Sequence, residues 1–149
     1  MQTQLAVAAY IIHNNKVLLI HHQKLDLWLP VGGHIDQNET PDDALLREIR
    51  EEVNLEVEIL NKLDLPVEGK TKKNLALPFY TNVHSVGDHD HACFYYVCKV
   101  INPEKININQ KEIKNFDWFT KEELNQKHIS ENVRNQALEA FKLFEKLTK

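Results

Sequence analysis

Three glutamates stand within five residues of one another in the segment GGHIDQNETPDDALLREIREEVNL, at positions 48, 51 and 52. A double glycine, Gly32-Gly33, precedes them. Carboxylates gathered on one side of a structure either face water or require a countercharge. Hard oxygen ligands of this kind suit Mg²⁺ or Mn²⁺. The segment is therefore a candidate metal site, if the carboxylates share a partly enclosed face.

The geometry of a helix decides whether they do. Residues 40–53 have a helical pattern, because Thr40 can cap the helix, Pro41 suits the first helical position and Asp43 stands where a capping-box acid belongs. At 3.6 residues per turn, the three glutamates fall within an arc of about 100°. They lie beside an apolar stripe that should face the core, formed by Leu45, Ile49 and Val53. Some desolvation of all three acids is expected there.

Electrostatics leaves two interpretations of this face open. If the face is wet, two carboxylates about 5 Å apart repel by roughly 0.8 kcal/mol. Arg47 and Arg50 then suffice as surface ion-pair partners. If the face is partly enclosed, the repulsion rises to about 3 kcal/mol and a cation is required.

The spacing around the glutamates resembles the signature of the Nudix hydrolases. That signature is glycine, five residues, glutamate, seven residues, arginine-glutamate, an aliphatic, any residue, two glutamates, any residue, glycine and an aliphatic. The matching residues are Gly33, Glu39, Arg47, Glu48, Ile49, Glu51, Glu52 and Leu55. Six fixed identities in register have a chance probability on the order of 10⁻⁷ per start position. With the lead-in WLPVGG, the resemblance covers residues 28–55.

One position departs from the signature, because Asn54 replaces its closing glycine. A helix that ends there needs a left-handed residue, and Asn is the commonest substitute for Gly in that role. We expect the turn to form at a cost below about 1 kcal/mol.

The resemblance implies that Glu48, Glu51 and Glu52 bind the metal, Mg²⁺ or Mn²⁺, together with the carbonyl of Gly33. The same resemblance leaves the general base open between a motif glutamate, Glu52 or Glu48, and a glutamate of a separate loop. Glu112, just before the FDWF run, is the loop candidate.

Three further motif residues have supporting roles by the same resemblance. Arg47 would orient the glutamates by charge-assisted hydrogen bonds. Glu39 would brace the loop against the start of the helix, and Gly32 supports the motif. A plain surface ion pair is the alternative for Glu39 and Arg47.

The implied activity is a metal-dependent hydrolase, a nucleotide pyrophosphatase that cleaves the diphosphate linkage of a nucleoside di- or triphosphate derivative. One alternative is a non-catalytic nucleotide-binding module on the Nudix fold, which the complete set of motif glutamates disfavours. A second is an RNA 5′-pyrophosphohydrolase, which the acidic balance disfavours. A third, an isoprenoid diphosphate isomerase, requires a cysteine-centred site with no evident counterpart around Cys93 or Cys98.

Strand-like runs surround the helix at residues 5–12, 16–22, 25–31, 55–60, 79–83, 91–101 and 112–119. A polar turn at 13–15 separates the first two runs, and 66–74 resembles an exposed loop. A brief helix at 120–124 and a longer one at 130–147 follow. This order predicts an α/β fold with a mixed sheet. The family resemblance implies a Nudix-type α/β/α sandwich with a loop-helix-loop catalytic motif at 33–55, in a single domain over residues 1–149.

Composition and charge limit which partners the protein is expected to have. The formal net charge of −4 over 149 residues argues against a dominant nucleic-acid surface. The single N-terminal apolar run is too short for a membrane span. Cys93 and Cys98 should point to opposite faces of one strand, so a mutual disulfide is disfavoured and a reducing, cytoplasmic location is expected. A small nucleotide-type substrate is the expected partner, and the resemblance is compatible with a homodimer.

Three other groups could take part in binding. His84, His89 and His91 could hold zinc, since the last two would share a strand face; a polar cleft lining or plain surface are the alternatives. Lysines 70, 72 and 73 could meet phosphates or simply be solvated. Aromatic side chains that could stack on a base, or fill the core, are Trp28, Tyr80, Phe94, Tyr95, Tyr96 and Trp118.

Overall fold

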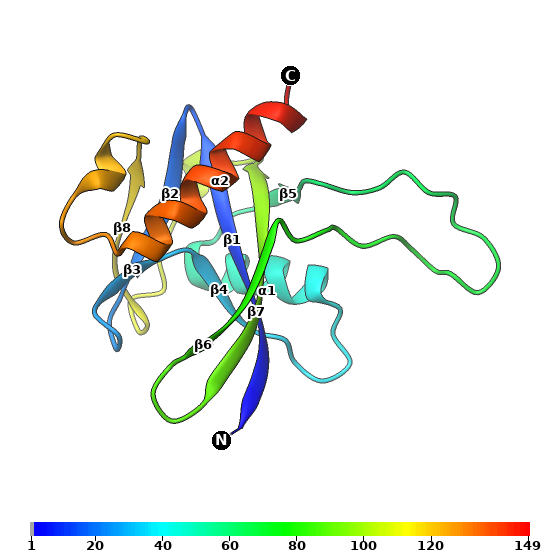
Figure 1. Ribbon diagram of the computed structural model, residues 1–149, viewed down its shortest axis with the longest axis horizontal. Helices are drawn as coiled ribbons and strands as arrows, with labels where there is room; N and C mark the ends of the chain where they lie inside the picture. The colour runs from blue at the N-terminus through cyan, green and yellow to red at the C-terminus, as the bar shows by residue number, and fades with distance from the viewer. Residues whose placement is uncertain (1) are drawn as a thin grey trace.

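The computed structural model describes residues 2–149, and within them one mixed sheet of eight strands lies between two helices (Figure 1). The strands are β1 (Thr3–His13), β2 (Lys16–His22), β3 (Leu27–Leu29), β4 (Val31–His34), β5 (Val57–Ile59), β6 (Tyr80–Ser85), β7 (Asp90–Val100) and β8 (Ile113–Phe119). The helices are α1 (Pro41–Val53) and α2 (Glu131–Leu147), and the 3₁₀ turns are η1 (Pro103–Lys105) and η2 (Glu123–Asn125).

Strand β1 is the centre of the sheet. It pairs in parallel with β7 from Thr3↔Asp90 to Ile12↔Lys99. On its other side it pairs antiparallel with β4 near its start and with β2 near its end. Strands β5 and β6 extend the sheet from β7, and β8 extends it from β2. Because β1 is covered on both faces, its sequence is a nearly continuous apolar run rather than an alternating one.

Alternate residues of β1 serve two separate cores. Val7, Ala9 and Ile11 pack with residues of α1, among them Leu45, Ile49 and Val53. Ala8, Tyr10 and Ile12 pack on the other face with residues of α2, among them Val133, Ala137 and Phe141. The result is the three-layer α/β/α sandwich expected from the sequence.

The two cysteines follow the same alternation. Cys98 belongs to the core under α1 and Cys93 to the core under α2. Both are buried and free, as expected from their spacing on one strand.

Both ends of α1 are fixed by the motif. Thr40 Oγ1 accepts a hydrogen bond from the Asp43 backbone N–H at 3.1 Å. At the other end Asn54 is left-handed, with φ 57° and ψ 38°, and its N–H donates to the Arg50 carbonyl. Its side-chain nitrogen also donates to the Lys105 carbonyl at 3.0 Å. Asn54 therefore closes the turn as expected.

The capping-box expectation at Asp43 was wrong. Its carboxylate lies 3.7 Å from Lys73 Nζ instead of reaching back to Thr40. The reciprocal pair forms at Thr120 and Glu123, where each backbone N–H donates to the other side chain. The helix expected at residues 120–124 is only the 3₁₀ turn η2, since the chain turns again before α2.

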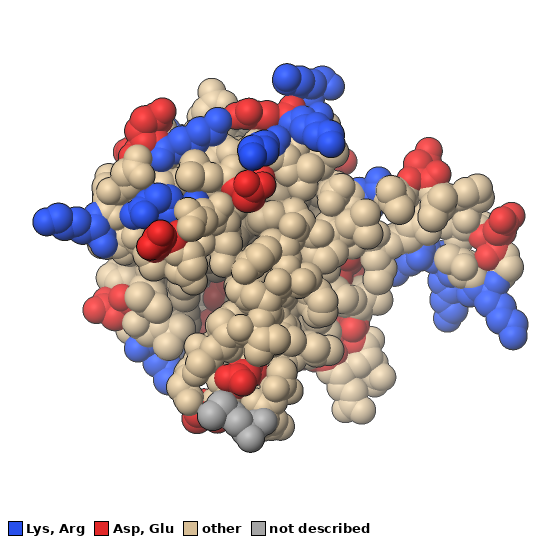
Figure 2. All heavy atoms as spheres, viewed as in Figure 1, with Lys and Arg blue, Asp and Glu red and all other residues tan. Residues whose placement is uncertain are grey.

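Residues 60–79, which we call the arm, connect β5 to β6 without helix or strand and project from the body (Figure 1). Backbone hydrogen bonds hold its base, from Leu60 N–H to the Val97 carbonyl and from Leu77 N–H to the Asn61 carbonyl. Acidic and basic side chains both lie on the surface of the arm (Figure 2). The loop expected at 66–74 is its exposed outer part.

Candidate active site

The two glycines let β4 approach α1 closely. A Cβ on Gly33 would overlap the carboxylate of Glu48. A Cβ on Gly32 would overlap the backbone of Val7 and Ala8 in β1. A side chain at position 32 would meet backbone that cannot yield, whereas one at position 33 would displace the Glu48 carboxylate, so the two glycines let the strand lie directly beneath the acidic helix.

Glu52 is the most enclosed of the three glutamates. It is only 4% exposed, and its Oε1 accepts a hydrogen bond from the Gly32 N–H at 3.0 Å. Burial raises the pKa of Glu52 from 4.5 to about 8, and the charge of Glu48 adds to the effect. Burial also raises the pKa of Glu48, against the lowering effect of Arg47. The pair therefore forms a desolvated acidic site that is short of positive charge.

Glu51 lies outside this enclosure. Its side chain is 57% exposed, against 15% for Glu48. The expectation that all three acids are desolvated was wrong for Glu51. Glu48 and Glu52 are one helical turn apart above β4, whereas Glu51 is rotated towards solvent.

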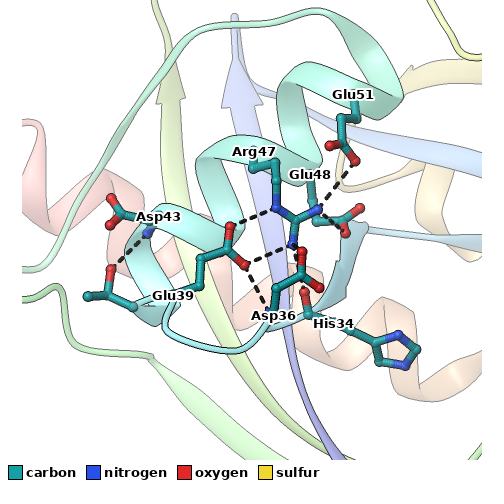
Figure 3. Close-up of polar contacts among 8 residues, drawn as sticks. His34, Asp36, Glu39, Asp43, Arg47, Glu48 and Glu51 are labelled. Carbon is teal, nitrogen blue, oxygen red and sulfur yellow. Dashed lines mark hydrogen bonds and ion pairs between the residues drawn. The ribbon is translucent and has the colours of Figure 1, made fainter.

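Arg47 connects the loop to the helix (Figure 3). Its Nε and Nη2 donate to both oxygens of Glu39 at 2.7 and 2.9 Å. Its Nη1 donates to Glu48 at 2.9 Å and to Glu51 at 3.3 Å. Nη2 also donates to the His34 carbonyl at 3.0 Å. One guanidinium thus fixes the loop, the end of β4 and two glutamates, which is more than a surface ion pair.

The carboxyl of Glu39 is ionised, as its hydrogen bonds with the Arg47 guanidinium require. Hydrogen bonds from Arg47, and one from the Asp36 N–H, lower the pKa of its carboxyl to about 2. Glu39 is therefore charged at neutral pH, and its bonds to Arg47 hold the loop to the start of α1.

A cavity of about 730 Å³ opens beside the acidic pair, and Glu112 lines it together with Glu48 and Glu52. Two backbone hydrogen bonds place the loop that carries Glu112: Asn109 N–H donates to the Glu52 carbonyl, and Gln23 N–H donates to the Glu112 carbonyl. The charge of Glu112 contributes to raising the pKa of Glu52. The structure thus brings together the motif and the loop candidate for general base.

Several cavity residues have no signal in the sequence. Lys24 and Lys111 line the cavity and supply positive charge there, yet each is an isolated lysine in the chain. His34 also lines it, together with His84 and His91. Only the pairing of β2 with β8 and of β4 with β1 brings these segments together.

Most of the other binding candidates fill the core or lie outside the cavity, the alternatives named for them. Within residues 2–149, Tyr95 is the one aromatic candidate among the cavity-lining residues, and the arm lysines are not among them. Tyr96 is buried in the core under α1, with Phe94 and Trp118 packed against it. Trp28 packs against the other core and stacks on His21 at 5.1 Å between ring centroids.

The donor chemistry of the acidic pair fits a hard divalent cation. Glu48 and Glu52 offer carboxylate oxygens, and the backbone of Gly33 lies against Glu48. Arg47 is already engaged with four acceptor residues and makes no bond to Glu52, so the buried carboxyl of Glu52 has no countercharge for its ionised form. Oxygen donors that lack a countercharge are what Mg²⁺ and Mn²⁺ prefer.

Comparisons with known proteins agree with this geometry. The NUDIX domain family model matches residues 2–141. A hydrolase of the NUDIX family from Clostridium perfringens has a similar structure, with a TM-score of 0.86 and 33% identity over 97% of this chain and 99% of that one.

Two curated proteins are similar in sequence. An 8-oxo-dGTP diphosphatase of Proteus vulgaris is 32% identical over 83 residues, which is 52% of this chain and 74% of that protein. An RNA pyrophosphohydrolase of Hydrogenovibrio crunogenus is 31% identical over 102 residues, 64% of this chain and 58% of that protein.

Within residues 2–149, neither helix has the length and apolar character that a membrane crossing requires. The match of the family model over nearly the whole chain and the complete set of motif glutamates lead to one assignment: the chain belongs to the Nudix hydrolase family.

Proposed function

We propose that this protein is a Mg²⁺- or Mn²⁺-dependent pyrophosphohydrolase that cleaves the diphosphate linkage of a nucleoside di- or triphosphate derivative. The observation that carries the proposal is the enclosed pair Glu48 and Glu52, placed over the β4 glycines at the wall of a cavity of about 730 Å³. The diphosphatase and pyrophosphohydrolase activities named for the two curated relatives support it.

Glu48 and Glu52 would hold the cation, with Glu51 at the solvent side and the Gly33 carbonyl as a further donor. A bound Mg²⁺ or Mn²⁺ neutralises diphosphate charge and lowers the pKa of water. Arg47 keeps Glu48 and Glu51 oriented towards the site through its hydrogen bonds. Gly32 anchors Glu52 by its backbone N–H.

Glu112 is the residue we assign as general base. Its side chain is exposed and lines the cavity, so it can reach a water molecule there. Glu52 is the rival, but it is buried and one of its oxygens already accepts the Gly32 N–H. Proton transfer to a positioned carboxylate contributes typically about 10²- to 10⁴-fold to the rate.

Lys24 and Lys111 would bind the phosphates of the substrate. Both line the cavity, and a polyanion needs such cations in an acidic protein. Tyr95 also lines the cavity, but it is buried in the core under α2, so no base-stacking role is assigned to it.

The proposal also covers the domain organisation, the oligomeric state and the cellular location. Residues 1–149 would act as one Nudix domain that takes a small nucleotide, with a homodimer as a further expectation. The free, buried state of Cys93 and Cys98 supports a reducing, cytoplasmic setting.

Hydrolysis of a substrate panel tests the proposal. Nucleoside triphosphates, oxidised nucleotides, nucleotide sugars and dinucleotides would be incubated with Mg²⁺ or Mn²⁺, and the phosphate, pyrophosphate and monophosphate products measured. Turnover of at least one nucleotide that requires the divalent ion and Glu52 is expected. Metal-independent turnover, or none by a folded protein, would overturn it.

The relative named RNA pyrophosphohydrolase makes 5′-triphosphate RNA the second candidate substrate. Salt separates the two, because RNA binding releases many counterions and a free nucleotide few. A shallow dependence of KM on NaCl supports the nucleotide, and a steep one the RNA.

A further inference from the structure

Three histidines converge at the mouth of the cavity, outside the carboxylate site. Nε2 of His91 lies 2.9 Å from Nε2 of His34 and 3.1 Å from Nε2 of His89. One ligand atom from each of the three lies within 4.8 Å of the other two. We propose that His34, His89 and His91 form a second metal site, for a borderline divalent cation such as Zn²⁺, Co²⁺ or Ni²⁺.

The sheet register brings these residues together from distant segments. His91 is the second residue of β7, and His89, two residues earlier, stands just before the strand with its Nε2 3.1 Å from that of His91. His34 ends β4, on the other side of β1. His34 is paired with Ala6 and His91 with Gln4, two residues apart on that central strand. Sequence spacing favoured His84 as the third member, whereas the fold supplies His34.

The backbone of His34 is held independently of its ring. Its carbonyl accepts from Arg47 at 3.0 Å, while its imidazole points away from Arg47 (Figure 3). His84 is directly opposite His91 on β6, but its Nδ1 is bonded to Asn82 and its ring centroid is 5.3 Å from that of His91. His84 therefore lies beside the three converging nitrogens without joining them.

Asp88 can orient one of the three rings for a metal. Its Oδ1 lies 2.7 Å from Nδ1 of His89, so Nδ1 carries the hydrogen and Nε2 presents its lone pair to the other two histidines. A carboxylate behind a histidine is the usual support of a metal ligand, because it fixes the ring and raises its basicity.

The two short separations lie in the range of hydrogen bonds and are also near that of two ligands on one metal, but hydrogen bonds alone cannot pair all three nitrogens. Two ligands about 2.05 Å from one tetrahedral zinc are roughly 3.3 Å apart. The Nε2 separations of 2.9 and 3.1 Å are close to this value. A single hydrogen on His91 Nε2 can serve only one of its two neighbours, whereas a cation accepts all three lone pairs. Imidazole nitrogen selects Zn²⁺, Co²⁺ or Ni²⁺ over Mg²⁺.

The position leaves room for a further ligand. His34 and His91 line the same cavity as Glu48 and Glu52, so a fourth coordination position can face the space where a phosphate oxygen would lie. The site is thus a separate cation-binding point for the same cavity.

Co²⁺ titration of the whole protein under saturating Mg²⁺ tests the proposal, since Mg²⁺ occupies oxygen sites and leaves imidazoles free. Wild type should take up one equivalent of Co²⁺ with a visible ligand-field band, displaced by Zn²⁺. His91→Gln should weaken Co²⁺ binding more than about 100-fold, and Asp88→Asn about 10-fold.

His21→Gln is the matched control. His21 also lies 2.7 Å from a carboxylate, that of Asp26, and is 23% exposed against 22% for His89. The His21→Gln protein should bind Co²⁺ like wild type. The Glu52→Gln protein should do the same, because its defect would concern hydrolysis alone. Unchanged binding in a folded His91→Gln protein, or loss of the band in Glu52→Gln, would overturn the site.

Discussion

The carboxylate of Glu52 accepts a hydrogen bond from the backbone N–H of Gly32, with 3.0 Å between the two atoms. This contact places a buried acid of the helix on the strand beneath it. Glutamine at position 52 can keep the hydrogen bond through its amide oxygen while losing the charge. The substitution therefore separates the structural from the chemical role of Glu52.

Glu52→Gln should reduce turnover by at least about 10²-fold with the fold intact. The reason is loss of an enclosed negative charge that is only 4% exposed. Steady-state kinetics at saturating Mg²⁺ gives the turnover, and circular dichroism with a thermal melt checks the fold. Near-normal turnover would refute the role of Glu52.

Ionisation of Glu52 should make the metal-free protein less stable, relative to Glu52→Gln, as pH rises between about 5 and 8. Glu52 has its pKa raised from 4.5 to about 8, so the native state binds more protons than the unfolded state in this window. Its stabilising contribution is complete below 4.5 and lost as pH passes 8, by at most about 1.4 kcal/mol per pH unit. Urea unfolding in EDTA measures this slope. Glu52→Gln should flatten it, and an equal slope in the variant would contradict the assignment.

Arg47→Lys should weaken Mg²⁺ binding about 10- to 100-fold, because an ammonium cannot span the loop and two glutamates as the guanidinium does. Arg50→Lys is the control: Arg50 makes a similar pair with Glu56, at 2.7 and 3.2 Å, on the exposed side of the same helix. Calorimetric titration with Mg²⁺ compares the two. Equal affinities would show that Arg47 does not organise the metal ligands.

Glu112→Gln should lower kcat about 10²-fold and leave Mg²⁺ affinity unchanged, as expected of a base that is not a ligand. Glu52→Gln should lower both quantities. Glu104→Gln, an exposed acid of η1, should change neither. If Glu112→Gln retains full kcat and the same pH–rate profile, the base is a motif glutamate.

Alanine at the two glycines should have opposite consequences. At Gly33 the added Cβ meets only the Glu48 carboxylate, which can swing away. Metal affinity should therefore fall while the melting temperature changes little. At Gly32 the Cβ meets the β1 backbone, which cannot yield cheaply, and the free energy of unfolding should drop by about 1–3 kcal/mol. Calorimetry and thermal melts of both variants test this contrast.

Local chemistry made much of the fold predictable. The run 16–22 is strand β2 with the expected bounds, and the turn at Asn14 and Asn15 has the positive φ angles that Asn tolerates, 50° and 60°. Thr40 and Asn54 delimit α1 for reasons visible in the sequence. These features depend on residues that are close in sequence, so they can be inferred from the sequence alone.

The remainder of the site depends on tertiary pairing. Glu51 has the same sequence spacing as its neighbours, yet only the position of β4 decides which acids are covered. Lys24 and Lys111 meet at one cavity through the pairing of β2 with β8, and no residue near either one signals it. His34 likewise reaches His91 only through the register of two strands on β1.

The central place of β1 also shapes how the chain reaches its native state. Strand β1 finds its longest partner only in β7, much later in the chain, with Thr3 opposite Asp90. Such non-local pairing gives a high contact order and hence slow folding. Helix α1 can form early, but the sheet beneath it cannot be completed until translation has passed residue 100, where β7 ends. Until then the edge of apolar β1 that pairs with β7 is unpaired, and an unpaired strand edge of this kind favours aggregation.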